Sequence, residues 1–158
     1  MELELNDKEA QRLIKMLKQA LQKYNIQLKE TDHGEIKFVG FGGVKNGEFK
    51  LIYKCSPENK VFQFMECKYY YTLFRINLNS NFHKNADGTR VYGNRINIFS
   101  EEEFIEKGDD HTYYRAYALP FEDIRNSTDF LEMFSDILKY ANIIVKDEIN
   151  ISIQSNLV

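Results

Sequence analysis

The chain has 158 residues, of which 43% are hydrophobic and 14% aromatic, including ten Tyr and twelve Phe. This length and composition predict one globular domain over residues 1–158 with an aromatic core, and they exclude an intrinsically disordered chain. The formal net charge of -3 excludes an overall positive field that would attract nucleic acid or an anionic membrane. A nucleic-acid site would therefore have to be a local patch.

The cysteines and the N-terminal segment indicate the environment. Cys55 and Cys67 are too few for a disulfide framework or a zinc site, and both lie in strand-like runs, so we expect buried free thiols. Residues 1–5 lack the basic and apolar regions of a signal peptide, and no apolar run approaches the roughly 18 residues of a membrane span. The sequence therefore predicts a soluble, cytoplasmic protein with no membrane partner.

An amphipathic helix is predicted over residues 7–24. Asn6 followed by Glu9 is a capping-box pattern, and apolar residues follow at helical spacing. The opposite face of this helix is rich in Lys, Arg and Gln, which is more typical of a solvated surface than of a basic binding face.

From Ile26 the hydrophobic period changes from helical spacing to alternation, with frequent turn signals, which indicates an antiparallel sheet. We predict a turn at residues 32–34, a two-residue hairpin at Asn46-Gly47 and a turn at residues 56–59. Residues 40–43 are glycine-rich, but a strand and not a helix follows them, so we expect a tight bend and no phosphate-binding loop. The predicted strands cover residues 26–31, 35–41, 49–55, 61–67, 68–78, 95–99 and 111–119.

The strand over residues 68–78 has apolar side chains on both faces, so we expect it in the centre of the sheet. A second capping box, Ser100 with Glu103, predicts a short helix that ends near Lys107.

A last helix is predicted over residues 128–140, and the alternating isoleucines of residues 149–153 fit an edge strand. Elements in this order, without alternation of strands and helices, predict an α+β fold. In that fold an antiparallel β-sheet of six to eight strands packs against an N-terminal helix and a C-terminal helix.

The residues with potential chemistry concentrate in the stretch His83 to Phe99, which follows one predicted strand and contains another. Polar side chains at strand ends are where a scaffold commonly presents function, although the same residues also make an ordinary loop. The candidate binding residues are Arg75, His83, Asn85, Asp87, Arg90, Arg95 and Asn97.

Four segments resemble an uncharacterised family of small proteins from Gram-positive bacteria and their phages. They are Leu73 to Leu78, His83 to Gly88, Gly93 to Phe99 and Ala116 to Leu119, and the resemblance covers roughly residues 70–142. The pattern of that family is an Arg-bearing hydrophobic strand, His-x-Asn-Pro-Asp-Gly, Gly-Pro-His-x-His-x-Tyr, a strand ending in Leu, and an acidic-aromatic helix.

The departures from this pattern bear on metal binding. Arg95 and Asn97 stand where the family has His-x-His, and Ala86 stands where it has Pro. Neighbouring histidines could bind zinc or iron or perform acid–base catalysis, but an arginine cannot ligate a cation. The resemblance therefore implies an altered histidine site, and we expect no metal, no cofactor, and a turn followed by a strand that presents Arg95. The residues kept from the pattern are His83, Asn85, Asp87 and Gly88.

Two alternatives for function remain open. His83 and His111 could act as acid and base, with Arg95 stabilising developing charge, in a metal-independent ribonuclease or phosphodiesterase. The run Tyr69 to Tyr71, with neighbouring basic residues, could instead stack the bases of single-stranded nucleic acid, although core packing also explains these aromatic residues. No spacing is diagnostic of catalysis, so an enzyme is the less favoured class.

The preferred expectation is a non-catalytic binding protein of phage or mobile-element type. Surplus Tyr, Phe and Arg suit a protein–protein interface. By analogy with small phage proteins that the chain resembles, such a protein would inhibit a host defence nuclease, as an anti-CRISPR protein does. The expected partner is a host protein, such as a nuclease or a nucleoprotein complex, and nucleic acid alone is a less favoured partner.

Overall fold

The computed structural model describes residues 2–145 and 148–154. Within these ranges the chain forms an eight-stranded sheet, two further strand pairs and three α-helices. The strands of the large sheet are β1 (Lys18–Ala20), β3 (Asp32–Gly40), β4 (Glu48–Ser56), β5 (Asn59–Glu66), β6 (Thr72–Leu78), β9 (Arg95–Phe99), β10 (Tyr114–Ala118) and β11 (Ile143–Ile144). The remaining elements are β2 (Tyr24–Leu28), β7 (Phe82–Lys84), β8 (Arg90–Tyr92), β12 (Ile149–Ile153), α1 (Asp7–Lys15), α2 (Glu101–Lys107), α3 (Phe130–Tyr140) and the 3-10 helix η1 (Val44–Asn46).

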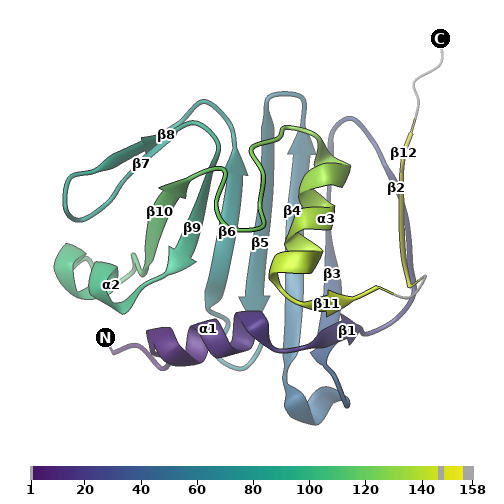
Figure 1. The fold of residues 1–158 in the computed structure, drawn as a ribbon, viewed down its shortest axis with the longest axis horizontal. Coiled ribbons are helices and arrows are strands. Elements are labelled where there is room, and N and C mark those ends of the chain that lie inside the picture. Colours follow the sequence, from purple (N-terminus) through teal and green to yellow (C-terminus); the bar gives the residue numbers. More distant parts are fainter. Residues whose placement is uncertain (1, 146–147, 155–158) are drawn as a thin grey trace.

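The large sheet has the strand order β10-β9-β6-β5-β4-β3-β1-β11 and is antiparallel except where β1 pairs with β11. The helices α1 and α3 lie across one face of this sheet, β2 and β12 pair beside it, and the β7–β8 hairpin lies near β10 (Figure 1). The predicted α+β class is therefore confirmed. No helix of the described part is long and apolar enough to cross a membrane.

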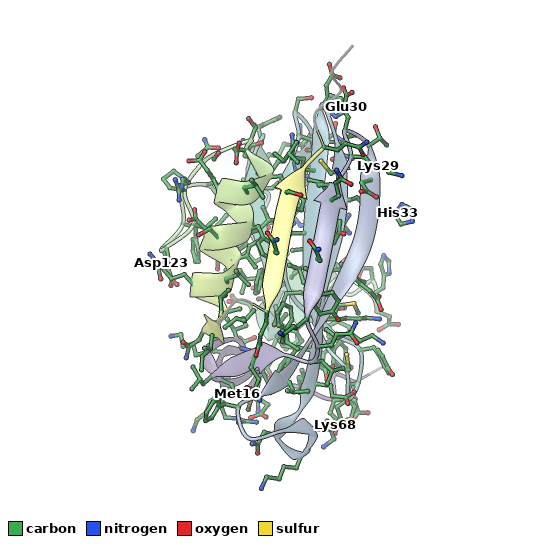
Figure 2. All side chains as sticks on the ribbon, turned by 90° about the vertical axis from the view of Figure 1, so that its right-hand side faces the viewer. Met16, Lys29, Glu30, His33, Lys68 and Asp123 are labelled. Carbon is green, nitrogen blue, oxygen red and sulfur yellow. The ribbon has the colours of Figure 1, made fainter. Side chains whose placement is uncertain are left out.

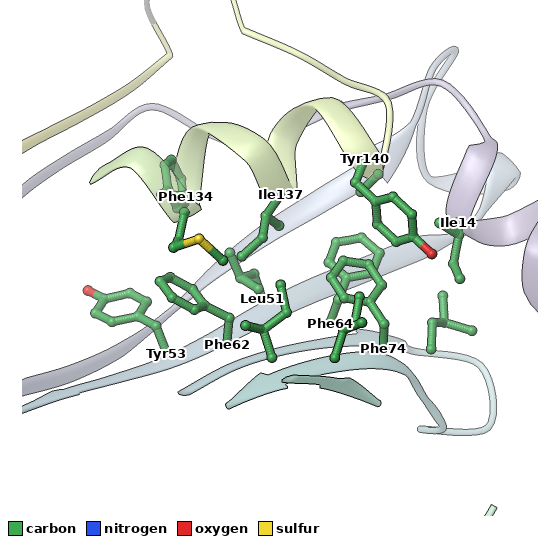
Figure 3. Packing of buried hydrophobic residues seen from close by; sticks show 14 of the residues in the cluster. Ile14, Leu51, Tyr53, Phe62, Phe64, Phe74, Phe134, Ile137 and Tyr140 are labelled. Atoms are coloured by element: carbon green, nitrogen blue, oxygen red, sulfur yellow. The ribbon is translucent and has the colours of Figure 1, made fainter. Parts of the chain in front are cut away.

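The core fills the space between α3 and the sheet, and it is aromatic, as predicted. Phe64 stacks between Phe49 and Phe74, with ring centroids 5.7 Å and 5.2 Å apart. From α3, Phe130 approaches Phe62 to 4.8 Å between ring centroids, and Tyr140 meets Phe74 edge-on (Figure 3). Aromatic pairs of this kind contribute about 0.5–1.5 kcal/mol each beyond the area that they bury.

The first helix begins where the sequence predicts and ends earlier. Asn6 Oδ1 accepts a hydrogen bond from Glu9 N at 2.7 Å, but the helix ends at Lys15 and not at residue 24. Lys18 is fully buried, and its Nζ donates to the carbonyls of Ile14, Met16 and Ala141 at 2.7–2.8 Å. One ammonium thus satisfies carbonyls at the ends of both α1 and α3, which leaves residues 18–20 free to pair as a strand.

The protonation of Lys18 follows from these contacts. Burial lowers the pKa of Lys18 to about 7. Three carbonyl acceptors, however, require three N–H bonds, which only the ammonium form has. The rings of Phe49 and Phe64 also lie within 5.5 Å of Nζ and stabilise a cation. The geometry therefore indicates a charged Lys18.

Two predicted turns are wrong, for different reasons. Residues 32–34 lie inside β3. A Cβ at Gly34 would come within 2.4 Å of Tyr53 Oη, so the glycine is needed because the Tyr53 side chain packs against it and not because the chain turns there. The residues before Glu48 form η1 instead of a two-residue hairpin, since Gly47 has a φ of 107° but Asn46 lies outside the positive-φ region that such a hairpin needs. The bend at residues 40–43 and the turn at residues 56–59 are confirmed.

The remaining elements agree with the sequence except at their ends. The strand predicted over residues 68–78 begins at Thr72 and lies between β5 and β9, buried on both sides. Asp129, not an earlier residue, caps α3, and β12 pairs in parallel with β2 outside the large sheet. Both cysteines are free thiols, but only Cys55 is buried and Cys67 is half-exposed.

Candidate functional site

The large sheet has a second face, opposite the side on which α3 packs. Figure 2 shows α3 on one side of the sheet and His33, from β3, pointing away on the other. Alternate residues of the strands point to this second face, because directly paired residues lie on the same side. The cross-strand pairs that define it are His33–Lys54, Glu35–Ile52, Lys37–Lys50, Ile52–Gln63, Gln63–Arg75, Arg75–Asn97, Asn77–Arg95 and Asn97–Ala116.

Four of the candidate residues come together on this face. Arg75 pairs directly with Asn97, and Arg95 is one pair further along the same two strands, so the two arginines are diagonal neighbours. His83, from β7, packs its ring 5.4 Å from the ring of Tyr114 on β10. We call Arg75, His83, Arg95 and Asn97 the polar cluster.

Arg95 and Asn97 are buried, whereas Arg75 and His83 are half-buried, so the expectation of a strand that presents Arg95 is wrong. Arg95 is only 7% exposed and Asn97 only 4% exposed. Arg95 Nη1 donates to Asn79 Oδ1 at 2.8 Å, to Gly93 O at 2.9 Å and to Asn81 O at 3.3 Å. These oxygens belong to the segments that flank the β7–β8 hairpin, which therefore cover the guanidinium with neutral acceptors.

The two arginines of the cluster have no carboxylate partner among the described residues. The nearby acids Asp87 and Glu103 both pair with Arg115, at 2.8 Å and 3.0 Å. Burial lowers the pKa of Arg95, and the positive charge of Arg75 lowers it further. The cluster therefore combines the buried cation of Arg95 with repulsion from the half-buried Arg75, which favours a bound anion.

His83 is uncharged at neutral pH in this environment. Burial is the main cause that lowers the pKa of His83, and the positive charges of Lys107 and Arg95 add to it. Its Nε2 is buried and has no hydrogen-bond partner. A negative charge beside this ring would raise the pKa of His83 instead of lowering it.

Asn85 and Asp87, which the sequence suggests as binding residues, fasten the hairpin. The Asn85 side chain donates to Ala116 O at 3.1 Å and accepts from Ala116 N at 2.9 Å, so its amide pairs with the backbone of the edge strand β10. Asp87 accepts from Arg115 and from Thr89 N. These contacts hold the hairpin tip against β10 and α2.

Arg90 and His111 lie apart from the polar cluster. Arg90 is exposed on β8, with its guanidinium 5.4 Å from the ring of Phe82. His111 is exposed in the loop between α2 and β10, where its Nδ1 lies 2.7 Å from Asp109 O. The structure thus brings His83 and Arg95 together, whereas no described contact connects His111 with them.

A second region, at the other end of the same face, was only partly recognised in the sequence. A hollow of about 160 Å³ is lined by Leu21, Lys37, Lys50, Cys67 and Tyr70, which we call the Tyr70 patch, together with Glu35, Glu48 and the core residues Phe38 and Phe49. Tyr70 is 61% exposed with a φ of 65°, and Lys50 Nζ lies 5.6 Å from its ring.

A buried carboxylate holds the segment that contains Tyr70. Glu66 is 3% exposed, and its two oxygens accept hydrogen bonds from the backbone N–H groups of Lys68, Tyr69 and Tyr71 at 2.8–3.1 Å. Tyr71 enters the core, whereas Tyr69 and Tyr70 stay outside. The signal in the sequence was an acidic residue three positions before a run of three tyrosines, which cannot all face one side of a strand.

The donor sets of the two regions indicate which ligands they suit. Among the described residues, no group of three or more His, Cys, Asp or Glu side chains is placed to hold a metal ion. The polar cluster offers guanidinium, amide and imidazole groups, which recognise anions through charge-assisted hydrogen bonds. The Tyr70 patch offers an aromatic ring and lysines, which suit a larger partner.

A family model described as a family of unknown function (DUF6978) matches residues 5–143. Comparison with curated proteins and with solved structures finds no match. The matched part runs from the residues before α1 to the start of β11 and includes the polar cluster and the Tyr70 patch. The expectation of an uncharacterised family is confirmed, and the chain belongs to DUF6978, a family of unknown function.

Proposed function

We propose that the protein is a non-catalytic binding protein that acts by protein–protein interaction through the Tyr70 patch. The observation that supports this most is the conformation of Tyr70, an exposed aromatic residue at positive φ. A non-glycine residue in this region costs on the order of 1–2 kcal/mol, and such strain clusters at functional sites. The hydrogen bonds that the buried Glu66 carboxylate accepts hold Tyr70 in this backbone conformation.

The charges around Tyr70 favour an acidic partner. Lys37 and Lys50 pair directly across β3 and β4 on the second face, and Lys54 lies on the same side of β4. Like charges directly opposite one another in a sheet are unfavourable, and Glu35, 4.0 Å from Lys37 Nζ, offsets the charge of that lysine alone. An anionic surface docked beside Lys50 would relieve the remaining repulsion. Glu35 and Glu48 also line the hollow, so lysines and carboxylates are equal in number there, and Lys50 is its lysine without an ion-pair partner among the described residues.

The nature of the partner rests on the resemblance to small phage proteins. We propose a host defence nuclease or its nucleoprotein complex as that partner, which the chain would inhibit by occupying an acidic surface of the nuclease. A phage or mobile-element origin of the chain is part of the same proposal. Nuclease active sites expose carboxylates that hold metal ions, which gives a basic-aromatic patch a complementary target.

The test is capture of host proteins from a bacterial lysate by the purified protein and by matched variants. We expect a stable complex with the parent protein that is lost with Tyr70→Ala and with Lys50→Glu. Tyr92→Ala is the control, because Tyr92 is equally exposed, at 63%, but lies on β8 outside the patch. Equal capture by Tyr70→Ala and Tyr92→Ala, or turnover of labelled RNA by the parent protein alone, would contradict the proposal.

Single-stranded nucleic acid is the second candidate partner, and the position of Lys50 over the ring of Tyr70 favours it. Such an arrangement can stack a base on the ring while lysines contact the phosphates. The measurement is fluorescence anisotropy of a labelled single strand over a series of salt concentrations. Binding that weakens steeply with salt and requires Tyr70 would favour nucleic acid over an acidic protein.

A further inference from the structure

The polar cluster contains an unusual concentration of unsatisfied hydrogen-bonding atoms. Within the described residues, five buried side-chain atoms have no hydrogen-bond partner, and four of them are Arg75 Nε, His83 Nε2, Arg95 Nε and Asn97 Oδ1. Buried polar atoms in folded proteins are nearly always paired, and an exception needs an explanation such as a missing ligand. Three of these atoms belong to adjacent positions of one sheet face and the fourth, His83 Nε2, to the hairpin beside it, which indicates a shared cause.

The guanidinium of Arg95 is only partly used by the protein. Nη1 makes all the hydrogen bonds of this group, to Asn79, Asn81 and Gly93, and Nε is left without an acceptor. The Nε edge of an arginine is one side of the fork that binds two oxygens of a carboxylate or phosphate. Arg95 is therefore fixed in place by one nitrogen while another remains available to a ligand.

Arg75 provides a second guanidinium at a diagonal position. Its side chain makes no described hydrogen bond, and its Nε is also buried without a partner. Two neighbouring cations without a carboxylate match a dianion better than a monoanion, because each positive charge then has a counter-charge.

Asn97 distinguishes between kinds of oxyanion. Its Nδ2 donates to Arg75 O and to Asn77 Oδ1, which fixes the amide orientation and leaves Oδ1 as an acceptor. A fully deprotonated oxyanion would repel this oxygen. A hydrogen phosphate carries an O–H group that can donate to it while its other oxygens accept from the arginines.

We propose that the polar cluster is a binding site for a phosphate group, in which Arg75 and Arg95 bind the phosphate oxygens, Asn97 accepts its O–H and His83 closes one side. The ligand is inorganic hydrogen phosphate or a terminal phosphate on a larger molecule. This site is separate from the Tyr70 patch and does not depend on the function proposed for that patch.

Entry to the site requires movement of the β7–β8 hairpin. The four unsatisfied atoms are shielded from solvent, whereas the side chain of Arg75 as a whole is only half-buried. Arg75 is thus the first group that an arriving phosphate meets. The hairpin then has to separate from β10, where Asn85 and Asp87 fasten it.

The first test is titration of the full chain with inorganic phosphate at pH 7 and constant ionic strength, followed by the NMR signals of the His83 ring and the Arg95 Nε–H group. We expect saturable shifts of both signals and a higher pKa of His83 in the bound form, because the anion offsets the neighbouring positive charges. Absence of saturable shifts in the parent protein would overturn the proposal.

The matched variants are Arg75→Gln and Arg90→Gln. Arg75 makes no described side-chain hydrogen bond, so its replacement should leave the fold intact, and Arg90 is an exposed arginine on the hairpin itself. We expect Arg75→Gln to weaken phosphate binding about tenfold or more, because a charge-assisted hydrogen bond is lost, and Arg90→Gln to bind as the parent does. An equal loss of phosphate affinity in both variants would show nonspecific attraction between charges and would overturn the proposed site.

Two further ligands identify the source of the phosphate. Sulfate, which has no O–H group at neutral pH, should bind more weakly than phosphate, and equal binding would overturn the proposed role of Asn97. A trinucleotide with a 5′-phosphate should compete with inorganic phosphate if the natural ligand is a nucleic-acid end. If only inorganic phosphate binds, the site is supported as one for the free ion.

Discussion

The polar cluster and the Tyr70 patch present positive charge on the same face of the sheet in opposite ways. In the polar cluster the segments that flank the hairpin cover the Arg95 guanidinium, Arg75 is half-buried, and four buried polar atoms lack partners within the described residues. In the Tyr70 patch the lysines are accessible, and the supporting carboxylate of Glu66 is fully hydrogen-bonded. A small ion therefore suits the first region after a movement of the hairpin, and a macromolecular surface suits the second without any movement.

The largest effect expected is the release of the hairpin in Asn85→Ala. This change leaves the buried N–H and C=O of Ala116 without partners, and we expect a loss of about 2–4 kcal/mol in the free energy of unfolding. Urea denaturation measures it. Asn25→Ala, at an exposed position of β2, should change stability by less than about 0.5 kcal/mol. Equal stability of the two variants would mean that the hairpin is not held by this amide.

A smaller effect is expected where the carboxylate that supports the Tyr70 patch is made neutral. Glu66→Gln replaces an oxygen that accepts backbone hydrogen bonds by an NH₂ group, which should cost about 1–2 kcal/mol. Hydrogen exchange should accelerate at the amides of residues 68–71 and remain unchanged in the hairpin. Glu35→Gln, an exposed change on the same face, is the control and should leave these amides protected.

The smallest effect concerns acid stability of the hairpin. Hydrogen bonds from Arg115 and Thr89 hold the pKa of Asp87 well below its ordinary value of 3.8. As pH falls below that value, the Asp87 carboxyl of the unfolded chain takes up a proton before that of the folded chain. The contribution of Asp87 to the free energy of unfolding is therefore present above about pH 4 and is lost toward lower pH. Asp87→Asn should therefore flatten the decline in melting temperature between about pH 5 and pH 2, roughly the titration range of a carboxyl group. A parallel decline in parent and variant would show that Asp87 does not contribute to acid stability. Asp123→Asn, an exposed change on the α3 side of the sheet (Figure 2), provides the reference.

The secondary structure was predictable wherever local patterns and tertiary contacts agree. The caps at Asn6 and Ser100 place the starts of α1 and α2, and the alternation from Phe49 to Cys55 places β4. The end of α1 was not predictable, because the apolar residues at positions 17, 20 and 21 continue the helical spacing beyond Lys15. Residues 18–20 form a strand because they pair with β3 and because Lys18 binds carbonyls at the ends of two helices.

The candidate site was predictable in composition and not in geometry. The sequence identified Arg75, His83, Arg95 and Asn97, and alternation on β9 placed Arg95 and Asn97 on one side. It did not show that the hairpin folds back over them, because that depends on the contact of Asn85 with β10, a strand distant in the sequence. The exposure of Tyr70 depends in the same way on the buried position of Glu66.

The pairing of the N-terminal with the C-terminal segment has a consequence for synthesis of the chain. Strands β1 and β2 both obtain a parallel partner from the last part of the described chain, β11 and β12. A nascent chain that has not yet reached Ala141 also lacks one of the three carbonyls that bind the Lys18 ammonium. During translation the antiparallel strands β3 to β6 can pair with neighbours already made, whereas closure of the fold around Lys18 has to wait for the final segment. The segment around Lys18 is therefore among the last parts of the described fold to be secured.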